Sequence, residues 1–100
     1  MKIEYTGRQT EITPELQRVA EQKLRKVAKL LPSITRAHVV LTADKHRRVA
    51  EVSVHSRQLD LAAVEVSTNP RLSVASAIDK LVRQAERQRT RRRVRKGAAS

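Results

Sequence analysis

Cysteine is absent from the sequence, and glycine and proline are scarce, with two and three residues respectively. Without thiols the chain can form neither disulfides nor thiolate metal sites. No apolar run approaches the roughly 18 residues of a membrane-spanning helix, and the opening Met1-Lys2-Ile3-Glu4-Tyr5 lacks the apolar stretch of a signal peptide. We therefore expect a cytoplasmic protein without a membrane partner, and the length of 100 residues suits a single domain.

Aromatic residues are almost missing as well, because Tyr5 is accompanied by no phenylalanine and no tryptophan. The apolar content of 39% is nearly all valine, leucine, isoleucine and alanine, so the core must be aliphatic. Proteins that bind single-stranded RNA stack its bases on aromatic side chains. A chain without such side chains is expected to contact the phosphates and sugars of a folded or helical RNA instead.

Positive charge dominates the composition, with a formal net charge of +12 and an isoelectric point near 11.4. Self-repulsion of this kind destabilises the folded state, and a polyanion such as nucleic acid relieves it. A solvated linker or a membrane-surface protein can have a similar composition. The regular apolar periodicity of the chain favours a folded nucleic-acid-binding domain.

The first helix is predicted from its start signal, its apolar stripe and its stop signal. Thr13-Pro14-Glu15 combines an N-cap threonine, a proline at the first helical position and an acid in the first turn. The helix should end before Pro32, because a residue that precedes proline is disfavoured in the α region. Its apolar stripe consists of Leu16, Val19, Ala20, Leu24, Val27 and Leu31.

A two-residue apolar period predicts four strands, at residues 2–6, 36–43, 48–56 and 59–66. In the first strand Ile3 and Tyr5 share one side, and Gly7 should end it. In the last strand Leu61 and Ala63 share one side. The opposite side of that strand is also apolar, which leaves its orientation open.

The two middle strands should form a hairpin with residues 44–47 as its loop. This register places Val39 opposite Val52 and Leu41 opposite Ala50. The apolar faces of the two strands then agree across the pair, which supports the register.

A second, long helix is expected after Asn69-Pro70, running to about Arg93. Its predicted inward residues are Leu72, Ala75, Ile78, Val82 and Ala85. The order β-α-β-β-β-α predicts an α+β two-layer sandwich, an antiparallel sheet with both helices packed on one face. We expect residues 1–94 to form this domain and residues 95–100 to form a basic disordered tail.

Basic side chains follow the polar faces of both predicted helices. A charged, solvated face is common on any helix, but the second helix has few acids to pair with its cations, so pairing within the helix cannot explain them. Arginine and lysine on such faces suit phosphate contacts. The predicted RNA-binding residues are Lys23, Arg25, Lys26, Lys29, Lys80, Arg83, Arg87 and Arg91.

The histidines suggest an enzymatic alternative. In the predicted register His38 and His55 lie near each other on the outer sheet face, with Asp60 across from His55, the outline of a ribonuclease-like acid–base site. No positioned nucleophile, metal-ligand set or glycine-rich phosphate loop accompanies them. We therefore favour exposed strand residues and expect no catalytic residue, metal, cofactor or small-molecule substrate.

Several short segments follow one another along the chain in a characteristic order. They are Ile3-Glu4-Tyr5-Thr6-Gly7, Glu11-Ile12-Thr13 followed by Leu16, the lysines Lys23 and Lys26, Val39-Val40-Leu41, and Asp79-Lys80-Leu81-Val82-Arg83-Gln84. Together, over nearly the whole length, they resemble the ribosome hibernation-promoting factor family, also called ribosome-associated inhibitor A or protein Y. The chain departs from that family at Asn69 to Ala75, which lacks the acid and the tyrosine found there. It resembles a short form or an isolated N-terminal domain, without the carboxy-terminal dimerisation domain of the long form.

The resemblance implies a fold similar to double-stranded-RNA-binding domains and a translation inhibitor of stationary phase and stress. Such factors lie between the head and body of the small ribosomal subunit, contact its rRNA in the decoding region and block mRNA and tRNA. Carried over by position, the residues implied are Lys23, Lys26, Lys80, Arg83, Arg87 and Arg91. The alternatives are a general nucleic-acid-binding or architectural protein, the ribonuclease above, and a partner bound through the basic tail alone. The sequence leaves the oligomeric state open.

Overall fold

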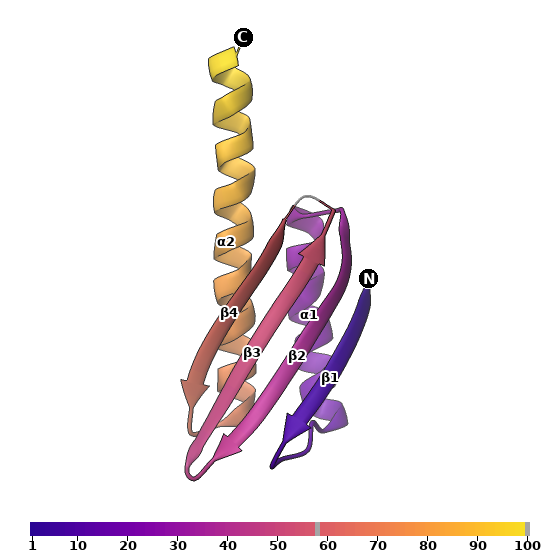
Figure 1. Cartoon of the computed structure of the whole chain (residues 1–100), viewed down its shortest axis with the longest axis vertical. Coiled ribbons are helices and arrows are strands. Elements are labelled where there is room, and N and C mark those ends of the chain that lie inside the picture. The colour runs from indigo at the N-terminus through magenta and orange to yellow at the C-terminus, as the bar shows by residue number, and fades with distance from the viewer. Residues whose placement is uncertain (58, 100) are drawn as a thin grey trace.

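The computed structural model describes the backbone of residues 1–57 and 59–99, and the side chains of these residues as far as Gln88. The elements are β1 (Lys2–Arg8), α1 (Pro14–Leu30), β2 (Ile34–Asp44), β3 (Arg47–Ser56), β4 (Asp60–Ser67) and α2 (Pro70–Ala99). The predicted order β-α-β-β-β-α is therefore confirmed (Figure 1).

The four strands form one sheet in the order β1-β2-β3-β4. Strands β2, β3 and β4 pair antiparallel through their hairpins, with Val39 opposite Val52 and Leu41 opposite Ala50 as predicted. Strand β1 instead runs parallel to β2, so the sheet is mixed and not purely antiparallel. The parallel pairing follows from the connection, because α1 carries the chain back to the end of the sheet at which β1 began.

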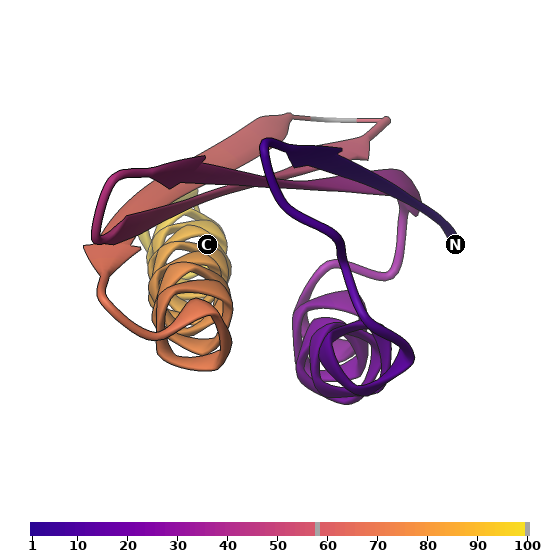
Figure 2. The same cartoon turned by 90° about the horizontal axis from the view of Figure 1, so that it is seen from below.

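Both helices cover the same face of the sheet, as Figure 2 shows end-on. The core between the two layers is aliphatic, and its largest fully buried side chains include Leu24, Leu41, Ile78 and Leu81. Leu61 and Ala63 of β4 face this core, whereas Val64 and Val66 are about half exposed on the open face. The observed burial thus settles the orientation of β4 that the sequence left open.

The ends of α1 follow the signals in the sequence. The Thr13 hydroxyl accepts a hydrogen bond from the Leu16 N–H at 3.2 Å, and Pro14 occupies the first helical position. Helix α1 ends at Leu30, ahead of Pro32, and the Leu31 N–H still donates to the Val27 carbonyl at 2.9 Å. These contacts satisfy backbone groups that a helix end would otherwise leave unpaired.

Gly7 does not end β1, which continues to Arg8. The glycine is required for a different reason: a Cβ at this position would collide with the carbonyl oxygen of Thr10. The chain turns sharply just beyond it, with Gln9 at a φ of 61°. Gly7 therefore permits a close backbone approach within the β1–α1 connection.

Tyr5 links β1 to α1. Its hydroxyl donates a hydrogen bond to the Gln17 carbonyl at 3.2 Å. Burial, and secondarily the nearby carboxylate of Glu21, raise the pKa of Tyr5 above its ordinary value. The phenol therefore stays protonated and serves as a packing and hydrogen-bonding group.

Helix α2 differs from its prediction at both ends. Leu72, expected inward, is 57% exposed, while Ser73 and Val74 are buried. The buried stripe continues through Ile78, and Leu72 lies on another side of the helix, since each residue turns it by about 100°. The helix also extends past Arg93 to Ala99, into the segment assigned to a tail, and the domain boundary at residue 94 stays a prediction.

Replacing Leu24 or Ile78 with alanine should lower the free energy of unfolding by about 2–5 kcal/mol, because each change leaves a cavity in the aliphatic core. Both side chains have an exposed fraction of 0%. Urea denaturation measures the effect. The control is Lys26→Ala on the exposed face of α1, which should change the stability by less than about 0.5 kcal/mol. A comparable loss in the control would contradict the assigned helix faces.

Candidate nucleic-acid interface

The two helices lie side by side and run in the same direction (Figure 1). Two ion pairs join them: Glu15 Oε1 lies 3.1 Å from Arg71 Nη1, and Asp79 Oδ1 lies 2.9 Å from Lys23 Nζ. Both pairs span a sequence separation of 56 residues. A constant separation means that the helices keep one parallel register across about two turns. The outer surfaces of α1 and α2 therefore form one continuous layer, opposite the sheet.

Cations cover the outer surface of this layer. Arg18, Arg25, Lys26 and Lys29 of α1 and Arg83 and Arg87 of α2 are all exposed. Among the described side chains none of these forms an ion pair. Their charge is available to an external anion without first breaking an internal contact.

The predicted cations span the whole breadth of the helix layer and do not form one compact cluster. Arg25 lies on the side of α1 near β1, where it lines a cavity of about 470 Å³ together with Ile3. At the opposite side, Lys80 contacts β4 and Arg87 lies above Leu61 of the same strand. A large polyanion that crosses both helices fits this spread better than a single phosphate.

Two of the predicted cations are already paired within the chain. Lys23 binds Asp79, and Lys80 Nζ lies 2.9 Å from Glu65 Oε1 while donating to the Val64 carbonyl at 3.4 Å. Such solvent-accessible pairs contribute little to stability, but they partly neutralise both lysines. The periodicity of each helix carries no signal of these two pairs, because the partners Asp79 and Glu65 lie on other elements.

The last predicted cation, Arg91, lies outside the described side chains, although its backbone belongs to α2. Two further arginines complete the described part of the layer. Arg18, which is exposed on α1 like Lys29, was not among the predicted RNA-binding residues. Arg71 was not anticipated, because its role is to pair with Glu15 across the helices.

The histidines do not form a joint site. His38 contacts the Thr6 hydroxyl at 2.8 Å, and His55 Nδ1 lies 3.1 Å from Asp60 Oδ1. His55 pairs with Asp60 across the strands as predicted, and the confirmed register places His38 opposite Ser53, two residues from His55 along β3. Each imidazole thus has its own partner on the open face. In the described part of the chain, no group of three histidine or acidic side chains is placed to hold a metal ion.

None of the helices, over the residues the structure describes, combines the length and apolarity needed to cross a bilayer. The long helix α2 is strongly basic along its C-terminal half.

Comparison with known proteins places the chain in a family. Residues 3–93 match the family described as Sigma 54 modulation protein / S30EA ribosomal protein. A ribosome hibernation promoting factor from Klebsiella oxytoca is 26% identical over 84 residues, which cover 84% of this chain and 88% of that protein.

Solved structures share the fold. A ribosomal subunit interface protein from Coxiella burnetii superposes with a TM-score of 0.79 at 21% identity, covering 90% of this chain and 99% of that one. The N-terminal domain of Thermus thermophilus Protein Y gives a TM-score of 0.78 at 26% identity, covering 87% and 98%. The chain therefore belongs to the Sigma 54 modulation protein / S30EA ribosomal protein family, whose members are ribosome-associated factors and not enzymes.

Proposed function

We propose that this protein is a ribosome hibernation factor of the cytoplasm, which binds the small-subunit rRNA in the decoding region and blocks mRNA and tRNA. The observation that carries the proposal is the layer of exposed cations across two parallel helices, most of which form no ion pair among the described side chains. The family membership of the chain and its likeness to a hibernation promoting factor support the ribosome as the target of that surface.

The chemistry of the layer suits structured RNA. Arg83 and Arg87 are four residues apart and hence separated by about 6 Å along α2, so both can contact one backbone. Guanidinium groups bind phosphate oxygens in a bidentate manner. Lys26 and Lys29 supply charge on the neighbouring helix. Phosphate contacts of this type depend on the shape of the RNA and do not distinguish its bases.

Inhibition then follows from occupancy. A folded domain that covers the decoding region and the tRNA-binding surface excludes other ligands by mass action and needs no chemical step. Arg83 and Arg87 should contribute more than Lys23 and Lys80, since each of these lysines must exchange an internal carboxylate for a phosphate.

Binding to ribosomes should weaken steeply with salt. If about six to ten phosphates are neutralised, a plot of log K against log salt should have a slope of roughly −4 to −9, because bound counterions are released. Fluorescence titrations at several potassium concentrations measure the slope. A slope near zero would exclude the electrostatic mechanism.

Pre-filling ribosomes with mRNA and tRNA should raise the protein concentration needed for binding, because the ligands compete for one site. The experiment compares titrations of vacant and tRNA-filled ribosomes at one fixed salt concentration. Identical curves would place the binding site elsewhere.

A separate comparison of affinities tests the alternative function. Equal affinity for duplex DNA and small subunits would favour a general nucleic-acid-binding protein.

Charge reversal on the outer helix surface should abolish translational inhibition. In the double variant Arg83→Glu/Arg87→Glu, two cations that face phosphates become anions, and affinity should fall by at least 100-fold, given the contribution of roughly one phosphate contact per cation. The matched control, Arg36→Glu/Arg47→Glu, changes net charge equally, but at exposed sites of the sheet and its hairpin. Equal losses in both variants would mean that net charge alone drives binding.

A further inference from the structure

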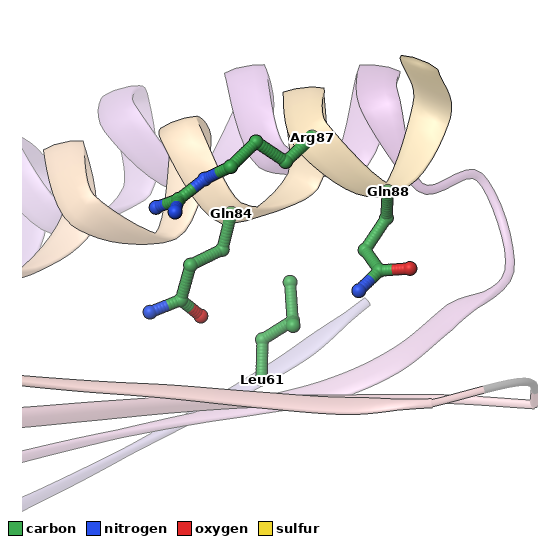
Figure 3. A pocket seen from close by; sticks show the side chains of 4 residues that line it. All are labelled: Leu61, Gln84, Arg87 and Gln88. Carbon is green, nitrogen blue, oxygen red and sulfur yellow. The ribbon is translucent and has the colours of Figure 1, made fainter. Parts of the chain in front are cut away.

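A pocket opens between α2 and the beginning of β4 (Figure 3). In Figure 1 the helix extends beyond the sheet from about this level. The pocket has a volume of about 300 Å³, and its lining residues are Leu61, Gln84, Arg87 and Gln88. We refer to it as the Gln88 pocket. This volume is at the lower end of the range for small-ligand sites, about 300–1,000 Å³.

The pocket exists because the core stripe of α2 ends in a polar residue. Val74, Ile78, Leu81 and Ala85 follow one another at helical spacing and are buried. The next position of the stripe is Gln88, which is half-buried. An apolar side chain there would complete the core above the sheet, whereas glutamine leaves a space lined by polar groups.

Leu61 forms the floor of this space. Its neighbour across the sheet, Val54, is 1% exposed, whereas Leu61 is only partly buried although it faces the helix layer. In Figure 3 the Leu61 side chain points from β4 toward α2, into the gap between Gln84 and Gln88. The pocket therefore offers an apolar contact surface to a flat group.

The walls of the pocket carry complementary hydrogen-bonding groups. Gln84 Nε2 donates to the Ala62 carbonyl at 3.2 Å, which fixes this amide and leaves its oxygen as an acceptor. Figure 3 shows the Gln88 amide reaching from the helix toward the strand on the other side of Leu61. The Arg87 guanidinium lies along the helix beside Gln84 and adds a cation to the site.

We propose that the Gln88 pocket binds one unstacked nucleobase of the RNA contacted by the helix layer. This inference rests on the proposed function, since Arg87 belongs to both surfaces. A nucleobase has flat apolar faces and a donor–acceptor edge, which match Leu61 and the two amides, and glutamine is a common partner of such edges. Base recognition in RNA usually involves unstacked nucleotides, on which arginine planes also stack.

The test uses short RNA oligomers of adenosine, cytidine or uridine and an abasic oligomer of the same length and charge, at fixed salt. At least one base-bearing oligomer should bind about tenfold more tightly than the abasic one, in line with the contribution of a single stacked base. It should also shift the Leu61 methyl resonances, and the abasic oligomer should not. Equal affinities, with unmoved Leu61 methyls, would overturn the proposal.

The variant Gln88→Leu fills the pocket with an apolar side chain that extends the core, so the protein should keep its melting temperature or gain stability. The tenfold base preference should disappear. The matched control Gln22→Leu, an exposed position of α1, should keep it. Retention of the preference in Gln88→Leu would place base recognition elsewhere.

Three outcomes separate this proposal from its alternatives. If free nucleoside monophosphates bind as tightly as the oligomers, the ligand is a free nucleotide and the RNA assignment is wrong. If the base preference is absent while mRNA and tRNA still compete with the protein for ribosomes, the assignment of the pocket to a base is wrong and the proposed function stands. A base preference without ribosome binding would support the pocket and remove the ribosomal target.

Discussion

The burial of two aliphatic helix stripes against a single face of the sheet determines how the charges of this protein are displayed. Because Tyr5 is the one aromatic residue of the sequence and is only partly buried, the core is filled by aliphatic side chains such as Leu24, Ile78 and Leu81, which must pack close to the strands. Each helix is thereby fixed in rotation about its own axis, and most of its described cations are exposed to solvent, although Lys80 also pairs with Glu65 of β4. The open face of the sheet has a different character, with the half-exposed valines of β4 and two histidines that each contact a different neighbour, Thr6 or Asp60. The cationic layer is thus a consequence of core packing, which places most of the described helix cations on one side of the domain.

Interhelical ion pairs solve a problem that this arrangement creates. Two parallel helices with basic outer faces repel each other, and their parallel macrodipoles do not compensate one another as antiparallel ones would. Glu15–Arg71 and Lys23–Asp79 place opposite charges where the helices meet. Each exposed pair stabilises the fold weakly, but both keep like charges out of the contact between α1 and α2. The remaining cations stay on the outer surface, where an RNA ligand can relieve their repulsion.

Local signals in the sequence were sufficient for most of the architecture. Thr13 and Pro32 mark the ends of α1 through chemistry confined to a few residues, and the Val39–Val52 register follows from matching apolar faces. The errors concern information that local patterns do not carry. Leu72 looked inward because it begins an apolar series, yet the tertiary packing of the first turn buries Ser73 and Val74 instead. The parallel direction of β1 depends on where α1 returns the chain.

In the candidate site, too, local sequence patterns predicted some features and the tertiary fold determined the others. Which residues are cationic and which helix face they occupy could be predicted from periodicity. The internal pairs of Lys23 and Lys80 could not, since Asp79 and Glu65 are brought to them by the fold. The Gln88 pocket was also beyond prediction, because its floor and walls come from β4 and α2.

The lack of aromatic residues constrains base recognition without excluding it. A protein that reads a run of bases needs a series of flat stacking surfaces, and this chain has no such series. One base requires less: an apolar floor, a donor and an acceptor, and a nearby cation to hold the attached phosphate. Leu61, Gln84, Gln88 and Arg87 meet these needs within one gap of the structure. The phosphate contacts of the helix layer would then supply affinity, while a single base would fix the position of the domain along the RNA.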